Sequence, residues 1–348
     1  MKTLQVGLVG YGLSGQVFHA PFVHTHPHMN LKKVVERRSG KSKERYPYVE
    51  VVTSYDELLG DDELDLIIIT TPNELHYPMV KSAVLAKKHV IIEKPFTVTY
   101  EEAKELTHLA REQGVKLCVY HNRRWDGDFK TIKKIAEQRL LGDIVEFESH
   151  FDRFRNYFKE NAWREEDRPG SGILYDLGSH LIDQALVLFG EPDAVMADTR
   201  IQRKAGKAID AFDVRLHYPA VSVILKAGML VREIGPRFIV HGTEGSFIKH
   251  KLDPQENALR QGAMPIDEGY GIEQEDSWGI LNTTVNGLHY RGKIETLPGS
   301  YQDFYQNVYE AIVEGKELEV KPEQAAMVIR IIELAEQSAR EQRAIAVN

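Results

Sequence analysis

The sequence predicts an α/β protein whose first third forms a doubly wound parallel sheet. Apolar runs with almost no polar alternation recur within residues 4–120, as expected for strands that are buried on both faces. Stretches with helical periodicity, such as 99–113, separate these runs. Glycines in GxGxxG spacing follow the first run directly. Strands and helices that alternate in this way are typical of parallel α/β sheets.

Five apolar runs are the predicted strands of this sheet. They are "LQVGLV" at 4–9, "LKKVVERR" at 31–38, "LDLIIITTPN" at 64–73, "KKHVIIEKP" at 87–95 and "VKLCVY" at 115–120. Ligands bind such sheets at the carboxyl ends of the strands. The residues that end the third and fourth runs are therefore candidate ligand contacts: Thr71, Pro72, Asn73, Glu93 and Lys94.

Composition limits the classes of function. The 348 residues are 42% hydrophobic and 28% charged, which is enough for two ordinary domains with cores of their own. Lys and Arg total 44 against 52 Asp and Glu, and no basic block occurs. This balance argues against nucleic acid or an anionic membrane surface as a partner and favours small-molecule ligands.

The sequence also predicts a cytoplasmic location. Cys118 is the only cysteine and lies in an apolar run, which favours a buried thiol in a reducing compartment. The start, "MKTLQVGLVGYG", reads as a first strand and not as a signal peptide. No window reaches the ~18 consecutive apolar residues that a membrane span requires.

The glycine motif predicts a dinucleotide-binding loop. Gly10 would make the tight turn, Gly12 would let the backbone approach a pyrophosphate, and Gly15 would let the helix pack against the strand. Leu13 and Ser14 belong to the same loop. The alternative is a plain glycine-rich turn, because three glycines at this spacing are weak evidence by themselves.

The end of the second strand bears on the choice of dinucleotide. An acid there favours NAD, whereas an arginine accommodates the 2′-phosphate of NADP. The sequence has Glu36, Arg37 and Arg38, and alternation along a strand prevents the first two from both facing the ribose. Two adjacent arginines suit a phosphate clamp, so we predict NADP. The alternatives are arginines on a solvated strand end, and NAD bound through Glu36.

Lys94 is the first candidate catalytic residue. It follows a buried strand, and Pro95 fixes the turn after it. Its ammonium could hold an alcohol or carbonyl oxygen and stabilise developing negative charge. A surface lysine at a strand end is the alternative.

A largely apolar helix, residues 173–189, carries three ionisable side chains. Asp176, His180 and Asp183 are spaced at i, i+4 and i+7, which places them on a single stripe. Two of them could be metal ligands, but no third or fourth ligand is evident in the sequence, and we predict no metal. A structural hydrogen-bonded pair in the core is the other alternative, and we interpret Asp183 as structural.

Several motifs together resemble the glucose-fructose oxidoreductase/inositol dehydrogenase family. They are the glycine motif, "TTPNELHYP" at 70–78, "EKP" at 93–95 and "DLGSHLID" at 176–183. Longer stretches more narrowly resemble its bacterial NADP-dependent scyllo-inositol dehydrogenases, namely "YHNRRWDGDF" at 120–129, "LYDLGSHLIDQAL" at 174–186, "GPRFIVHGTEGSFIK" at 235–249 and "DSWG" at 276–279.

The resemblance implies a Rossmann domain at 1–121 and an α+β domain at 122–348 with an open, mostly antiparallel sheet. The exposed face of that sheet would form a homo-oligomer, a dimer or a tetramer. The sequence agrees, with strand-like segments at 144–155, 194–203, 210–218, 221–228 and 237–241 and a closing helix at 322–342.

The resemblance also implies roles for the candidate residues. Lys94, Asp176 and His180 correspond to the catalytic set: His180 as general base, Asp176 orienting the substrate or the imidazole, and Lys94 holding the oxygen. His76 joins Thr71, Pro72 and Asn73 among the cofactor contacts. The expected activity is the reversible oxidation of a cyclic polyol, preferably scyllo-inositol, with NADP. Another sugar or polyol, or a non-enzymatic dinucleotide-sensing regulator on the same fold, are the alternatives.

Two further motifs are predicted to contact the substrate. In "YHNRRWD", Tyr120, Asn122 and Arg123 or Arg124 could bond polyol hydroxyls, although the arginines could equally bridge the domains. The resemblance also places Trp163 and Arg164 near cofactor and substrate, and a hydrophobic anchor in an exposed loop is the alternative. By contrast, His24, His26 and His28 in "HTHPH" read as a surface helix end and not as a metal site.

Overall fold

The computed structural model describes residues 2–159 and 162–347. By their contacts, these residues form two compact units. Unit 1 comprises Met1–Trp125, Pro254–Tyr270 and Ser300–Ala326, and unit 2 comprises Asp126–Asp253, Gly271–Gly299 and Met327–Asn348. Two late segments of the chain thus pack with the amino-terminal sheet, and the sequence boundary after residue 121 stays a prediction.

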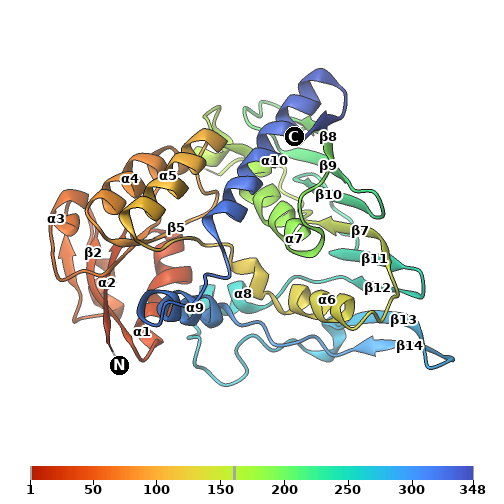
Figure 1. The fold of residues 1–348 in the computed structure, drawn as a ribbon, viewed down its shortest axis with the longest axis horizontal. Helices are drawn as coiled ribbons and strands as arrows, with labels where there is room; N and C mark the ends of the chain where they lie inside the picture. Colours follow the sequence, from red (N-terminus) through yellow and green to blue (C-terminus); the bar gives the residue numbers. More distant parts are fainter. Residues whose placement is uncertain (1, 160–161, 348) are drawn as a thin grey trace. The chain divides into compact units, whose positions relative to one another are not determined.

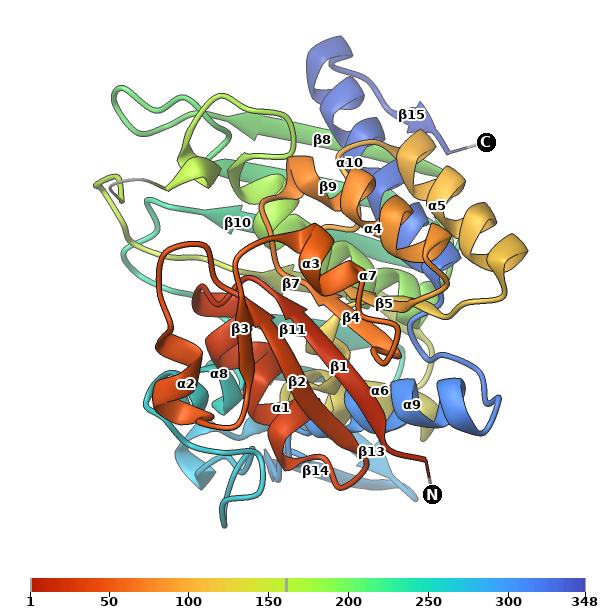
Figure 2. The same cartoon turned by 90° about the vertical axis from the view of Figure 1, so that its left-hand side faces the viewer.

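Unit 1 contains the predicted parallel sheet. Its six strands have the order β3-β2-β1-β4-β5-β6, and all are parallel. They are β1 (Leu4–Val9), β2 (Met29–Val35), β3 (Glu50–Val52), β4 (Leu66–Ile69), β5 (His89–Ile92) and β6 (Leu117–Val119). Figure 2 shows β3, β2 and β1 side by side. The doubly wound fold is confirmed. The sequence missed β3 because this edge strand has only three residues and begins with an exposed glutamate.

Most helices of unit 1 connect its strands, and two more, α8 and α9, come from later segments of the chain. They are α1 (Ala20–Thr25), α2 (Lys41–Arg45), α3 (Tyr55–Leu59), α4 (His76–Leu85), α5 (Tyr100–Gln113), α8 (Gln255–Arg260) and α9 (Tyr301–Val313). α4 and α5 lie side by side in Figure 1. The prediction of a helix at 99–113 is confirmed, since Thr99 and Glu102 form a capping box and Gly114 ends the helix at φ 69°.

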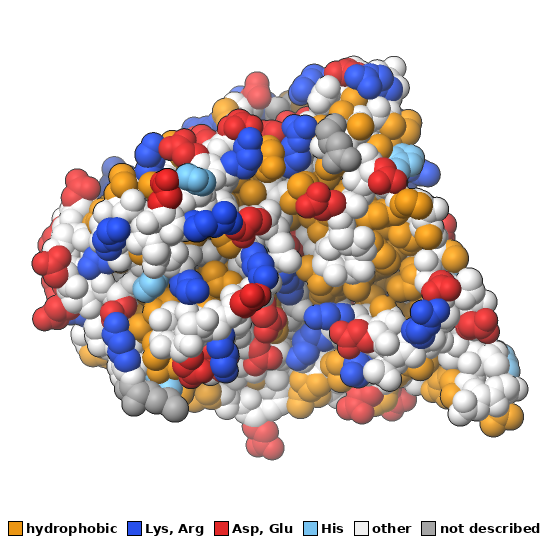
Figure 3. Space-filling view, viewed as in Figure 1, with side chains coloured by type: hydrophobic (Ala, Val, Ile, Leu, Met, Phe, Trp, Pro, Cys, Tyr) orange, Lys and Arg blue, Asp and Glu red, His pale blue; other side chains and the backbone are white. Residues whose placement is uncertain are grey.

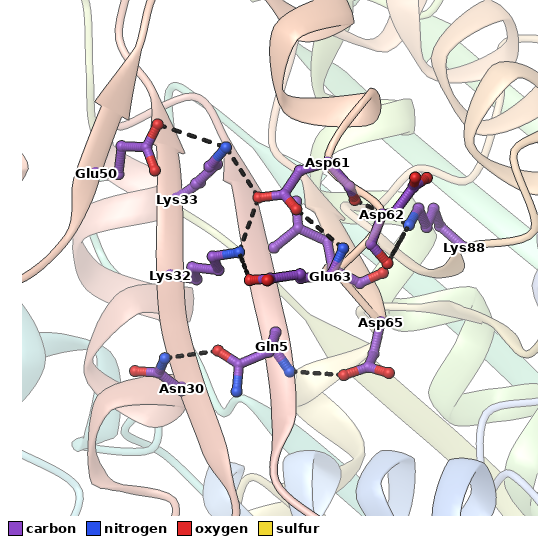
Figure 4. Close-up of polar contacts among 11 residues, drawn as sticks. Gln5, Asn30, Lys32, Lys33, Glu50, Asp61, Asp62, Glu63, Asp65 and Lys88 are labelled. Atoms are coloured by element: carbon purple, nitrogen blue, oxygen red, sulfur yellow. Dashed lines mark hydrogen bonds and ion pairs between the residues drawn. The ribbon is translucent and has the colours of Figure 1, made fainter.

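A polar network covers the amino ends of the strands in unit 1 (Figure 4). Val6 lies opposite Leu31 and Gly7 opposite Lys33, so Lys32 is the extra residue of a β-bulge. Because of this bulge, two consecutive side chains, Lys32 and Lys33, reach the Asp61 carboxylate at 3.0 and 2.8 Å. The network lies at the edge opposite to the one where such sheets bind ligands.

Unit 2 is built on a nine-stranded sheet of order β14-β13-β12-β11-β7-β10-β9-β8-β15, in which only the β7–β10 pair is parallel. Its strands are β7 (Ile144–His150), β8 (Ala194–Arg200), β9 (Ala211–His217), β10 (Ser222–Gly228), β11 (Phe238–Gly242), β12 (Gly245–Lys249), β13 (Gly279–Val285), β14 (Leu288–Ile294) and β15 (Ile345–Ala346). The mostly antiparallel sheet is confirmed. The sequence missed β12 and β13, which mix apolar and polar residues, and also the polar β14 and the two-residue β15.

Helices cover one face of the sheet in unit 2. They are α6 (Gly127–Glu137), α7 (Ser179–Phe189) and the later turns of α10 (Pro322–Glu341) (Figure 1). Phe147 of β7 packs edge-on against Phe189 of α7 at 5.5 Å between ring centroids. α10 confirms the predicted closing helix.

The surface agrees with the charge balance of the sequence. On the face drawn in Figure 3, Lys and Arg side chains are interspersed with Asp and Glu and form no extended basic area. Within residues 2–159 and 162–347, no helix combines the length and the apolar character that crossing a membrane requires.

Candidate functional site

The glycine motif forms an open loop at the carboxyl end of β1. Gly10 has φ +95°, and a Cβ on Gly15 would lie 2.4 Å from the Gly10 carbonyl oxygen, so both positions require glycine. Nothing lies within 4 Å of the place where a Cβ of Gly12 would be, and Leu13 is exposed. The loop therefore has the room and the accessible backbone that a pyrophosphate group needs.

The helix behind this loop begins irregularly. Gly15–His19 form a π-helical turn before α1 begins at Ala20. Such turns are rare and are often found at functional sites. The turn buries His19 completely, and its Nε2 lies 3.0 Å from Oε1 of Glu93.

At the end of β2, Glu36 is buried and faces the start of α2. Its carboxylate accepts hydrogen bonds from Ser39 Oγ at 2.5 Å, Lys41 N at 3.1 Å and Ser42 N at 2.9 Å. Burial alone would raise the pKa of Glu36, but these hydrogen bonds lower it below its usual value. Arg37 and Arg38, by contrast, are exposed.

Glu93 connects the carboxyl end of β5 to the glycine loop. Its Oε1 accepts hydrogen bonds from Ser14 Oγ and from His19, and its Oε2 accepts one from Lys94 N at 3.1 Å. Burial raises the pKa of Glu93, yet His19, Ser14 and the charge of Lys94 lower it to about 2. Glu93 is thus a carboxylate with 13% of its side chain exposed, and it connects the segments after β1 and β5. Lys94 precedes Pro95 through a cis peptide bond.

His76 is buried between two backbone segments. Its ring is fully buried, with Nδ1 2.8 Å from the Pro95 carbonyl oxygen and Nε2 2.9 Å from the Thr71 carbonyl oxygen. Burial lowers the pKa of His76, while the two carbonyls and Glu93 act in the opposite direction. With no exposed surface, the ring contacts the backbone of two segments, and its expected contact with a cofactor stays a prediction. Asn73, in the same turn, is also buried.

Tyr120 is also buried. Only 1% of it is exposed, and its ring packs 4.5 Å from His19 and 4.9 Å from Phe304 between centroids. The ring of Tyr120 thus lies in an aromatic core, and its contact with a substrate stays a prediction.

Sequence reasoning missed His19 and Tyr305. The Tyr305 hydroxyl donates to the Phe18 carbonyl at 2.5 Å and lies 2.9 Å from His19 Nδ1. Tyr305 belongs to α9, which is nearly 300 residues away along the chain. The spacing of Tyr301, Tyr305 and Tyr309 could have indicated a helix with a buried aromatic face, but not what that face covers.

The arginines of "YHNRRWD" are held within unit 1. Arg123 is buried and forms an ion pair with Glu256 of α8 at 2.8 Å. Arg124 donates from Nη1 to the carbonyl oxygen of Glu319 at 2.7 Å. Asn122 is buried in the short 3₁₀ turn that also holds both arginines.

In unit 2, the ionisable stripe lies on an irregular helix start. Leu174–Gly178 form a π-helical turn that leads into α7, so the regular helix expected over 173–189 begins only at Ser179. His180 and Asp183 are buried, whereas about a quarter of the Asp176 side chain is exposed. The wider turn sets Asp176 apart from the regular stripe.

Arg164 lies between Trp163 and Asp176. The Arg164 guanidinium lies 4.4 Å from the centre of the Trp163 ring, and its Nε is 3.3 Å from Oδ1 of Asp176. Trp163, Arg164 and Asp176 therefore form one partly exposed group in unit 2. Lys94 belongs to unit 1.

The three histidines of "HTHPH" contact aromatic and amide side chains. His24 Nδ1 lies 2.8 Å from the Tyr48 hydroxyl, and His26 Nε2 lies 3.1 Å from the Gln306 side-chain oxygen. His28 stacks on Tyr309. In the part of the chain that the structure describes, no three His, Cys, Asp or Glu side chains are grouped as a metal site would require.

Comparison with known proteins identifies the family. Residues 4–121 match "Oxidoreductase family, NAD-binding Rossmann fold" and residues 133–347 match "Oxidoreductase family, C-terminal alpha/beta domain". The chain is 43% identical to scyllo-inositol 2-dehydrogenase (NADP(+)) IolW of Bacillus subtilis, covering 99% of this chain and 96% of that protein. It is 41% identical to the uncharacterized oxidoreductase YdgJ of Escherichia coli, with 97% and 96% covered.

The solved structures agree with this assignment. The putative oxidoreductase yvaA of Bacillus subtilis superimposes with a TM-score of 0.96 at 41% identity, covering 100% of this chain and 99% of that one. A putative oxidoreductase of Bacteroides fragilis gives 0.92 at 46% identity, with 99% and 100% covered. With both domains matched and relatives similar over the full length, the chain belongs to the glucose-fructose oxidoreductase/inositol dehydrogenase (Gfo/Idh/MocA) family of oxidoreductases.

Proposed function

We propose that this protein reversibly oxidises a cyclic polyol, preferably scyllo-inositol, to the corresponding ketone with NADP. The observation that carries the proposal is the 43% identity, over nearly the whole of both chains, to a relative whose name states that activity. The presence of Lys94, Asp176 and His180 supports it, because a non-enzymatic regulator would not need them.

The choice of NADP is supported at the end of β2. The Glu36 carboxylate is already occupied by three donors at the start of α2, which leaves Arg37 and Arg38 as the exposed charges next to this strand end. Two guanidinium groups fit a 2′-phosphate. The open loop from Gly10 to Gly15, with Leu13 and Ser14, would hold the pyrophosphate. When bound, the dinucleotide supplies the two-electron acceptor.

The chain's own residues would handle the proton and the oxygen. His180 would take the hydroxyl proton of the substrate, because a histidine can accept a proton near neutral pH. Lys94 would hold the same oxygen and stabilise its negative charge as the C–H bond breaks. Asp176 would orient the substrate or the imidazole. In the reverse direction, His180 returns the proton to the ketone oxygen.

Initial rates test this proposal. NADPH or NADH formation is followed by absorbance with scyllo-inositol and myo-inositol, each with NADP and NAD. We expect the highest kcat/KM for scyllo-inositol with NADP. Turnover of neither inositol would refute the proposed substrate, and a preference for NAD would refute the role of the arginines.

Variants test the assigned residues. Lys94→Ala and His180→Ala should each lower kcat by about 10²- to 10⁴-fold, the usual range for losing a proton-transfer or charge-stabilising group. Lys104→Ala and His108→Ala, both on exposed positions of α5, are matched controls and should retain wild-type rates. Near-normal turnover in the first two variants would remove the assigned mechanism. Assembly through the sheet of unit 2 and a cytoplasmic location stay predictions.

A further inference from the structure

The segment that carries Lys94 is anchored on both sides of this residue. The residue before it, Glu93, is fixed through its side chain to Ser14 and His19. The residue after it, Pro95, is fixed through its carbonyl oxygen to His76. His76 also contacts the Thr71 carbonyl, so a single buried ring connects the segments that follow the neighbouring strands β4 and β5.

The contact of His76 with the Pro95 and Thr71 carbonyl oxygens requires two hydrogen-bond donors to be fully satisfied. Carbonyl oxygens only accept hydrogen bonds, and both ring nitrogens of His76 face one. A neutral imidazole has one N–H and would satisfy one carbonyl, while an imidazolium satisfies both. The ring is also completely buried, and the loss of one of its donors removes a hydrogen bond to the backbone of this segment.

We propose that His76 is a positioning residue that sets the place of the Lys94 ammonium by holding the backbone of Thr71 and Pro95 together. The proposal rests on the proposed function only for the statement that Lys94 is catalytic. His76 itself contacts neither substrate nor cofactor. Because a misplacement of about 1 Å can cost on the order of 10²-fold in rate, a small movement of this segment would impair catalysis while leaving the fold intact.

Three variants test the proposal. His76→Phe keeps a planar ring of similar size but removes both ring nitrogens, and His76→Gln keeps one donor nitrogen beside an oxygen that only accepts. His89→Phe is the matched control: His89 lies on β5 at the opposite end from Lys94, where its Nδ1 accepts a hydrogen bond from Lys116 N at 2.9 Å. This control removes a histidine hydrogen bond from the same strand without touching the Lys94 segment.

The first measurement does not depend on activity. Full-length proteins are acetylated briefly with an amine-reactive ester, and mass spectrometry gives the labelling rate of Lys94 relative to Lys251, an exposed lysine of unit 2. We expect this ratio to change at least threefold in His76→Phe, less in His76→Gln, and not in His89→Phe. An unchanged ratio in a folded His76→Phe protein would overturn the proposal, and His76→Gln decides if His76→Phe does not fold.

The second measurement separates positioning from stability. With the polyol that the wild type oxidises, kcat of His76→Phe should fall roughly 30- to 100-fold while KM for the polyol changes less than threefold. His76→Gln should recover part of kcat. A melting temperature lowered equally in His76→Phe and His89→Phe, with kcat retained in both, would show a purely structural role. If the wild type oxidises no polyol, the proposed function fails and the labelling ratio alone decides the role of His76.

Discussion

Replacing Arg37 and Arg38 together by alanine should weaken NADPH binding strongly and NADH binding little. A charge-assisted hydrogen bond to phosphate is worth about 1.5–3 kcal/mol. Both arginines are exposed at the end of β2, so solvent screening reduces this contribution below that range, to about 1–1.5 kcal/mol each. The pair then contributes ~2–3 kcal/mol, which corresponds to a Kd for NADPH raised roughly 30- to 150-fold.

Fluorescence titration with NADPH and NADH at fixed ionic strength measures this effect. Arg139→Ala, which removes an exposed arginine of unit 2 paired with Asp143, should leave both affinities unchanged. Equal losses for both cofactors, or a Kd for NADPH within threefold of wild type, would refute the reasoning. Glu36→Gln gives the complementary test, because a carboxylate that bound the NAD ribose would make this variant lose NADH affinity selectively.

Two further predictions concern stability and reactivity. Hydrogen bonds from Lys32 and Lys33 hold the pKa of Asp61 well below its usual range, so their stabilisation is present at neutral pH and is lost as pH falls below the unfolded value near 4. Asp61→Asn should therefore lower the free energy of unfolding by about 2 kcal/mol at pH 7, and this difference from wild type should become smaller below about pH 4. Urea unfolding at several pH values measures the difference. A difference that does not depend on pH would contradict the prediction. Burial raises the pKa of the Cys118 thiol, so Ellman's reagent should label it on the order of 10²-fold more slowly in the native protein than in urea, and equal rates would show that the thiol is accessible.

The hydrogen-bond partners of Glu36 and His76 could not be predicted from the sequence. Alternation along β2 indicated that Glu36 and Arg37 face opposite ways, but not that three donors at the start of α2 occupy the carboxylate. The motif "TTPNELHYP" indicated that His76 matters, but its second partner, Pro95, lies 19 residues further along the chain. Partners of buried polar groups follow from packing, and local sequence does not encode them.

Local patterns of residues were sufficient to predict some of the elements. Uninterrupted β-branched runs are favourable only as strands buried on both faces, so β4 and β5 were evident, and the capping signals around α5 are equally local. Other features depend on residues that are distant along the chain and follow only from the packing of the whole fold. Such features include the three-residue edge strand β3 and the strands β12 to β14. They also include the π-helical turns before α1 and α7 and the contact between Tyr305 and His19. Short or mixed segments of this kind have weak intrinsic strand preference, and the pairing and burial that neighbouring elements supply stabilise them.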